Sequence, residues 1–172
     1  MSDLLKELTH YICWKVDNPS ELGATKLNKA LWFADTIAYR ANGRSITNAT
    51  YVKRQFGPVP KRILTVLDEL NREGKVVSRD RPYFNRVKRD FIALQPASDS
   101  AFSEQERQII DLVIDRVCHD HTATSISEIS HDVIWEAAEE GEEIPLYAVL
   151  GAFPGEITDE DKEWASKVIS AR

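Results

Sequence analysis

The sequence has little of several features that define common protein classes. Cys13 and Cys118 are the only two cysteines in 172 residues, and two cysteines so far apart are typical of free thiols in a reducing compartment. No apolar run approaches the ~20 residues that a membrane-spanning helix needs. The first residues show no basic segment followed by a hydrophobic one, the pattern of a signal peptide. We therefore expect a cytoplasmic protein that does not associate with membranes.

The residue patterns of common enzyme sites are also missing. Glycine occurs only seven times and without clusters, which excludes a glycine-rich phosphate loop. No Gly-x-Ser-x-Gly element is present, and Cys13 lies beside the apolar face of a predicted helix, where a cysteine usually packs. The sequence therefore predicts neither an enzyme nor a cofactor.

Residues 118–121, Cys-His-Asp-His, together with His131 are the best candidates for metal ligands. Neighbouring residues rarely converge on one ion, and neither Cys-x-x-Cys nor His-Glu-x-x-His is present. The alternative is a polar helix end, where a histidine interacts favourably with the helix dipole. We predict no bound metal.

Length and charge suggest how the chain is organised. A chain of 172 residues is long enough for one domain with a hydrophobic core, so we predict a single domain over residues 1–172. Residues 53–89 carry a net charge of +7 and residues 99–163 a net charge of −15, within a total of −6. These two regions either face a polar partner or partly neutralise each other within the fold.

Helical periodicity is strongest in the central motif, residues 23–60. It predicts one amphipathic helix that Thr25 caps and Gly43 ends. An extended segment should follow it. Residues 57–58, Gly-Pro, then predict a turn before a helix that begins at Pro60.

Residues 60–94 predict a basic helix followed by a hairpin. The helix should end before Gly74, and two β-prone runs follow it at residues 75–78 and 87–94. Residues 79–82 supply turn chemistry between the two runs. A helix followed by a hairpin with a basic tip is the order of elements in a winged-helix unit.

Residues 103–171 predict an acidic helical part. Helix starts are indicated by a capping box at Ser103 and Glu106, and by Thr124 or Ser125, Pro145 and Thr158 further along. We therefore predict a mainly α fold: a compact multi-helix domain with one small β-hairpin as a winged-helix-like insertion.

Four segments and a tryptophan carry further information. They are residues 26–35 (KLNKALWFAD), 42–44 (NGR), 53–59 (KRQFGPV) and 126–131 (ISEISH), followed by Trp135. In this order they resemble the Panacea domain, the SocA-like antitoxin family that is also met among phage-associated proteins. The resemblance implies an antitoxin that neutralises a cognate toxin by direct contact, with the toxin encoded nearby in a bacterial or prophage operon. It also implies a possible role as an adaptor that presents the toxin to a protease.

The cores of protein interfaces favour aromatic residues and arginine. By that criterion the candidate partner-binding residues are Trp32, Tyr51, Arg54, Phe56, Tyr83 and Phe84. The same aromatic residues are also suited to the hydrophobic core.

For the remaining residues of the family motif we expect a structural role. They are Lys26, Asn28, Lys29, Asp35, Gly57, Pro58, Ser130, His131 and Trp135. Lys29 and Asp35 flank the apolar stripe of the central helix, and we expect them to pair with Arg54 or to cap the turn at 57–60. A histidine packed near Trp135 can fasten the C-terminal helices to the body.

A winged-helix-like DNA-binding regulator is the alternative function. Arg79, Arg81 and Arg86 would contact phosphates. Against this, the helix that would read the bases carries acids such as Asp68 and Glu69, whereas base edges are usually read by hydrogen-bond donors.

Overall fold

The computed structural model of the chain describes residues 3–151, so the predicted helix that begins at Thr158 lies outside the described residues. Helix α2 (Gly23–Asn42) confirms the central helix of the sequence analysis. It ends at Gly43, whose φ of 71° is left-handed and therefore suits a residue without a side chain. The predicted Thr25 cap is wrong, because α2 already begins at Gly23 and no side chain caps it.

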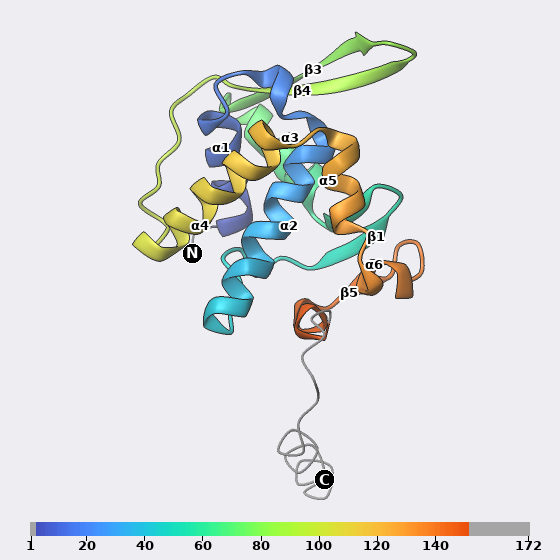
Figure 1. Cartoon of the computed structure of the whole chain (residues 1–172). Coiled ribbons are helices and arrows are strands. Elements are labelled where there is room, and N and C mark those ends of the chain that lie inside the picture. The colour runs from blue at the N-terminus through green and yellow to red at the C-terminus, as the bar shows by residue number, and fades with distance from the viewer. Residues whose placement is uncertain (1–2, 152–172) are drawn as a thin grey trace, which may run out of the picture.

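Three further helices pack around α2 (Figure 1): α1 (Leu4–Lys15), α4 (Glu104–Ile114) and α5 (Ala123–Ser130). A short 3-10 turn, η1 (Pro19–Glu21), connects α1 to α2. Because α2 has neighbours on several sides, five apolar residues in its middle are at most 1% exposed: Leu27, Ala30, Leu31, Ala34 and Ala38. Residues at the centre of the main core include Leu8, Ile12, Leu27, Leu31, Val66, Leu70, Phe91, Ile110 and Val113.

A three-stranded antiparallel sheet, which the sequence analysis did not predict, lies beside α2. It consists of β1 (Tyr51–Arg54), β2 (Gly57–Pro60) and β5 (Glu143–Ile144) in the order β2-β1-β5. Residues 57–60 are therefore a strand paired with β1, and the turn lies before them at residues 55–56. Prolines are tolerated in β2 because it is an edge strand, where not every backbone N–H needs a partner.

Helix α3 (Ile63–Arg72) leads into a long hairpin, β3 (Val76–Tyr83) and β4 (Arg86–Ala93), which projects from the body of the protein (Figure 1). The hairpin was predicted, but its turn was misplaced. Residues 79–82 pair with β4 as part of β3, and the chain turns at Phe84, which has a φ of 51°. The helix before the hairpin begins at Ile63 and not at Pro60.

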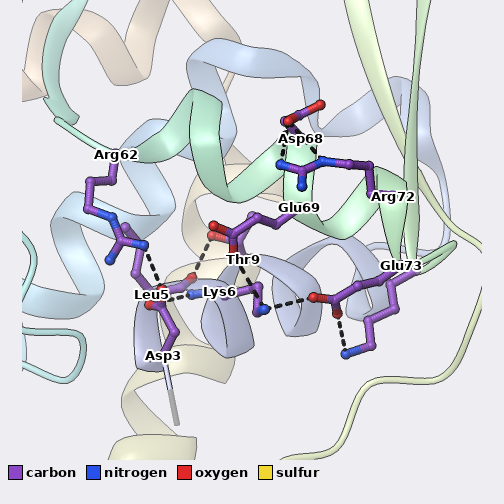
Figure 2. A network of polar contacts seen from close by, with 10 residues as sticks. Asp3, Leu5, Lys6, Thr9, Arg62, Asp68, Glu69, Arg72 and Glu73 are labelled. Atoms are coloured by element: carbon purple, nitrogen blue, oxygen red, sulfur yellow. Dashed lines mark hydrogen bonds and ion pairs between the residues drawn. The ribbon is translucent and has the colours of Figure 1, made fainter. Parts of the chain in front are cut away.

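Ion pairs fix α3 against α1 (Figure 2). Lys6 Nζ lies 2.8 Å from Glu73 Oε1 and 3.4 Å from Glu69 Oε2, and Arg62 Nη2 lies 2.9 Å from Asp3 Oδ2. The acidic side chains of α3 are thus already matched by cations of the protein itself.

The C-terminal part follows the predicted order of elements with shifted boundaries. The capping box of Ser103 and Glu106 opens α4, which continues as a π-helix, η2 (Asp115–Asp120). Thr122 caps α5, in place of the predicted Thr124 or Ser125, although Ser125 completes the capping box. The helix then stops at Ser130 and a separate α6 (Val133–Ala137) follows. A 3-10 helix, η3 (Leu146–Leu150), begins after Pro145 as predicted.

Two sheets accompany the helices, so the prediction of a mainly α fold with one small hairpin is only partly right. Helices are the most abundant elements, but the fold mixes α and β structure. The winged-helix-like arrangement stays a prediction. Among residues 3–151, no helix combines the length and apolar character that crossing a bilayer requires.

Candidate functional site

Lys29 is the most unusual residue of the fold, because its side chain points from α2 into the interior with only 1% of its surface exposed. Its ammonium donates a hydrogen bond to the carbonyl oxygen of Phe56, in the turn between β1 and β2. No carboxylate of the described residues lies within ion-pair distance of it. Burial without a counter-ion disfavours the charged form and lowers the pKa of Lys29 to about 8.

Gly57 allows this close approach of α2 to β2. Its φ is 121°, and a Cβ atom at this position would overlap with Lys29 Nζ and lie 2.8 Å from Ser130 Oγ. Ser130, at the end of α5, is itself 1% exposed and donates to the Ser127 carbonyl at 2.9 Å. The structure thus brings together Lys29, Gly57 and Ser130, three motif residues that are far apart in the sequence.

His131 and Trp135 fasten the C-terminal helices to the same turn. Their rings are stacked, with centroids 3.8 Å apart and an interplanar angle of 8°. Trp135 Nε1 donates to the Arg54 carbonyl at 3.0 Å. On β1, Lys53 Nζ lies 4.1 Å from the centroid of a Trp135 ring and donates to the Ala138 carbonyl at 2.8 Å.

The environment of His131 favours the neutral imidazole. Burial, followed by the charge of Lys29, lowers the pKa of His131, while a hydrogen bond with the backbone of Phe56 opposes this shift. Its Nε2 atom is buried and has no hydrogen-bond partner in the part of the chain that the structure describes.

A pocket of about 270 Å³ opens beside Lys29. Its lining comes from the first two turns of α2, the β1–β2 turn and β2, and one acidic residue: Ala24, Thr25, Asn28, Lys29, Arg54, Gln55, Phe56, Pro58, Val59 and Glu140. Asn28 Oδ1 is buried there and has no hydrogen-bond partner among residues 3–151. At the rim, Arg54 Nη1 lies 3.6 Å from Glu140 Oε1, and both side chains are more than half exposed.

Asp35 is buried elsewhere in α2 and has a different role. It accepts hydrogen bonds from Thr47 N at 2.8 Å, from the Tyr51 hydroxyl at 2.7 Å and from the Thr47 hydroxyl. Burial raises the pKa of Asp35, and the hydrogen bonds from Thr47 and Tyr51 oppose this shift. The expected pair with Arg54 is therefore absent, and Asp35 anchors the loop between α2 and β1.

The six candidate partner-binding residues do not form one surface. Trp32 and Tyr51 are buried, with ring centroids 4.9 Å apart, and present no surface to a partner. Arg54 and Phe56 are exposed at the pocket. Tyr83 and Phe84 lie at the tip of the β3–β4 hairpin, where Phe84 is 91% exposed.

The candidate nucleic-acid-binding arginines lie on the hairpin, but two of them contact a carboxylate there. Arg81 Nε lies 3.0 Å and Arg79 Nη2 3.9 Å from Oδ2 of the buried Asp90. Arg86, next to the tip, has no ion-pair partner within residues 3–151. The candidate metal ligands do not converge either: the described residues contain no group of three or more acidic, histidine or cysteine side chains that could hold an ion.

Comparison with known protein families assigns the chain to one of them. The profile described as "Antitoxin SocA-like, Panacea domain" matches residues 27–136, more than half of the chain. The chain belongs to the SocA-like antitoxin, or Panacea, family. The resemblance noted in the sequence is thereby confirmed. No curated protein and no solved structure matches the chain significantly.

Most of the Panacea motif residues meet in the region around Lys29, the β1–β2 turn and the end of α5. Lys26 is an exception: its side chain is directed from α2 toward η2, where it donates a hydrogen bond to the Cys118 carbonyl at 2.8 Å. Pro58 lines the pocket from β2. Sequence reasoning did not assign Thr47, Lys53 or Glu140 to this site. Lys53 lies in a segment that carries the family resemblance, which was the one available signal, whereas the contacts of Thr47 and Glu140 depend on the fold.

Proposed function

We propose that this protein is an antitoxin that neutralises a cognate toxin by binding it directly. The observation that carries the proposal is the match to the SocA-like antitoxin family over residues 27–136. In this role the protein catalyses no reaction, and it acts by covering the active or target-binding face of the toxin with a folded surface.

The exposed candidates define two surfaces for the toxin contact. The first is the rim of the pocket, with Arg54 and Phe56, and the second is the hairpin tip, with Tyr83 and Phe84. Exposed aromatic residues and arginine are the side chains that most often dominate binding energy at interfaces. We favour the pocket rim, because the motif residues of the family gather beneath it.

Co-expression with the product of the neighbouring gene tests this function. The neighbour alone should stop bacterial growth, and growth should return when the present chain is expressed with it. Phe56→Ala should weaken the rescue of growth. Tyr147→Ala, which removes a different exposed aromatic side chain (67% exposed), should leave the rescue unchanged. A neighbour that is harmless by itself would refute the antitoxin assignment.

A role as a proteolytic adaptor is a finer version of the same proposal. It requires the toxin to be degraded faster when bound, so the toxin half-life after translation is blocked should shorten on co-expression. An unchanged half-life together with restored growth would leave neutralisation by binding alone.

A further inference from the structure

We propose that the pocket beside Lys29 binds a carboxylate carried by a peptide segment of the partner protein. This inference rests on the proposed function, because it names the chemistry that the toxin would present to the pocket.

The charge around the pocket is unbalanced. Lys29 is 1% exposed, and its ammonium has no carboxylate partner within the described residues. A buried charge is unfavourable unless it is paired. The first turn of α2, which lines the same pocket, contains no acidic residue and no side-chain cap, so no side chain of that turn compensates the positive end of the helix dipole. A bound anion would correct both features.

The unpaired atom indicates what else the ligand must carry. Asn28 Oδ1 is buried, and none of the described residues donates a hydrogen bond to it. If the amide were turned by 180°, its NH₂ group would need an acceptor instead, and either end of the amide can pair with a peptide group. A phosphate ester dianion offers only acceptor oxygens, whereas a peptide combines a carboxylate with backbone N–H donors.

Size and lining also favour a peptide. About 270 Å³ holds one amino-acid side chain with part of its backbone and is below the range typical of cofactor sites. Phe56, Pro58 and Val59 give the pocket an apolar wall, which suits the aliphatic part of an acidic residue better than a fully hydrated phosphate.

Glu140 is the competing anion at the rim. Its carboxylate lies 3.6 Å from Arg54, and both side chains are exposed, so the pair is weak and opens readily. We expect Arg54 to exchange Glu140 for the incoming carboxylate. Removing the charge of Glu140 should therefore strengthen ligand binding, whereas removing the charge of Arg54 should weaken it.

Titration of the ¹⁵N-labelled full chain with four N-acetylated alanine-based tripeptides, followed by NMR, tests the proposal. One peptide ends in a free carboxylate and the second in the matching amide. The third carries a glutamate before an amide end, and the fourth carries glutamine in its place. At least one carboxylate peptide should shift the signals of residues 24–29 and 54–59 saturably, and the neutral peptides should not. Comparison of the first and third peptides identifies a chain terminus or an acidic side chain as the preferred source.

Variants of the chain supply the controls. Lys29→Met should weaken binding of the carboxylate peptide at least tenfold, and Lys75→Met, which removes a cation paired with Glu73 at 2.8 Å, should leave it unchanged. Arg54→Gln and Glu140→Gln alter exposed side chains, so both variants should fold. Arg54→Gln should lower the affinity for the carboxylate peptide several-fold, and Glu140→Gln should raise it several-fold.

Three results would overturn the proposal. They are the absence of saturable shifts with both carboxylate peptides, equal affinity in Lys29→Met, and tighter binding of inorganic phosphate at the same signals. The titration contains no toxin, and the growth assay contains no peptide. If the growth assay fails while the peptide still binds, the antitoxin role alone is refuted. If growth is restored but no carboxylate peptide binds, the carboxylate pocket alone is refuted.

Discussion

Gly57 of β2 lies where side chains of α2 and α5 approach its backbone closely. Its conformation, with φ of 121°, is one that side chains rarely adopt, and the space that a Cβ would need is taken by Lys29 Nζ and Ser130 Oγ. Gly57→Ala should therefore lower the free energy of unfolding by about 3 kcal/mol, from backbone strain and overpacking together. Chemical denaturation of the purified variant measures this loss.

Gly43 provides a matched control for Gly57. It also has a left-handed φ, of 71°, but nothing lies within 4 Å of the Cβ that alanine would add. Gly43→Ala should cost only about 1 kcal/mol, which is the backbone term alone. In a Lys29→Ala background the penalty of Gly57→Ala should shrink toward that value. Equal penalties at the two glycines would show that close packing around Gly57 is not the cause.

Lys29 should make the stability of the protein depend on pH in the alkaline range. Burial lowers the pKa of Lys29 in the folded state to about 8, against 10.5 for an ordinary lysine. Below pH 8, Lys29 is protonated in both the folded and the unfolded state, so Lys29 does not make the free energy of unfolding depend on pH there. Between pH 8 and 10.5 the unfolded state binds more protons, and the free energy of unfolding rises with pH.

The expected gain is about 2.5 kcal/mol between pH 7 and pH 10, since each pKa unit corresponds to about 1.4 kcal/mol. Denaturation of the wild type and of Lys29→Met at each pH isolates this effect from other groups that titrate in the same range. The difference in unfolding free energy between the two proteins should change by that amount in favour of the wild type. A difference that stays constant with pH would mean that Lys29 keeps an ordinary pKa despite its burial.

At the scale of elements, the long helices were predictable and the small sheet was not. The apolar positions of α2 repeat over twenty residues, which gives a clear helical signal. β1 and β2 have four residues each and β5 only two, too few for an alternating pattern to stand out. The pairing of β1 with β5 also joins segments about ninety residues apart, and local sequence patterns contain no information on such contacts.

The turn predicted at residues 57–58 lies two residues earlier in the structure, although the residues used to predict it are typical of turns. Gly57 and Pro58 are typical turn residues, and we placed the turn there. In the fold, the glycine is required by Lys29, and the proline occupies an edge strand opposite Lys53. Of the candidate site, the sequence identified the motif residues but not the pocket, because the pocket depends on how the turn and the C-terminal helices pack against α2.

At the scale of the whole molecule, part of the charge separation along the chain is cancelled by folding. Lys61 Nζ lies 2.8 Å from Glu143 Oε1, and Arg54 lies 3.6 Å from Glu140, so residues of the basic middle contact residues of the acidic C-terminal part. The hairpin behaves similarly, because Arg81 and Arg79 lie 3.0 Å and 3.9 Å from the carboxylate of Asp90, which lies just beyond the basic middle. The net charge of +7 over residues 53–89 therefore overstates the positive charge that a partner would meet.

Weak DNA binding is the expected consequence. Two of the three candidate arginines on the hairpin contact Asp90, and the chain as a whole carries a charge of −6. Since affinity for DNA depends on the number of phosphates that free cations neutralise, we expect no electrophoretic shift of the protein's own promoter at ~1 μM protein and physiological salt. The triple variant Arg79→Ala, Arg81→Ala, Arg86→Ala should still neutralise the toxin. A shift that weakens steeply with salt and disappears in this variant would instead support the winged-helix-like regulator, with the projecting hairpin as its DNA contact.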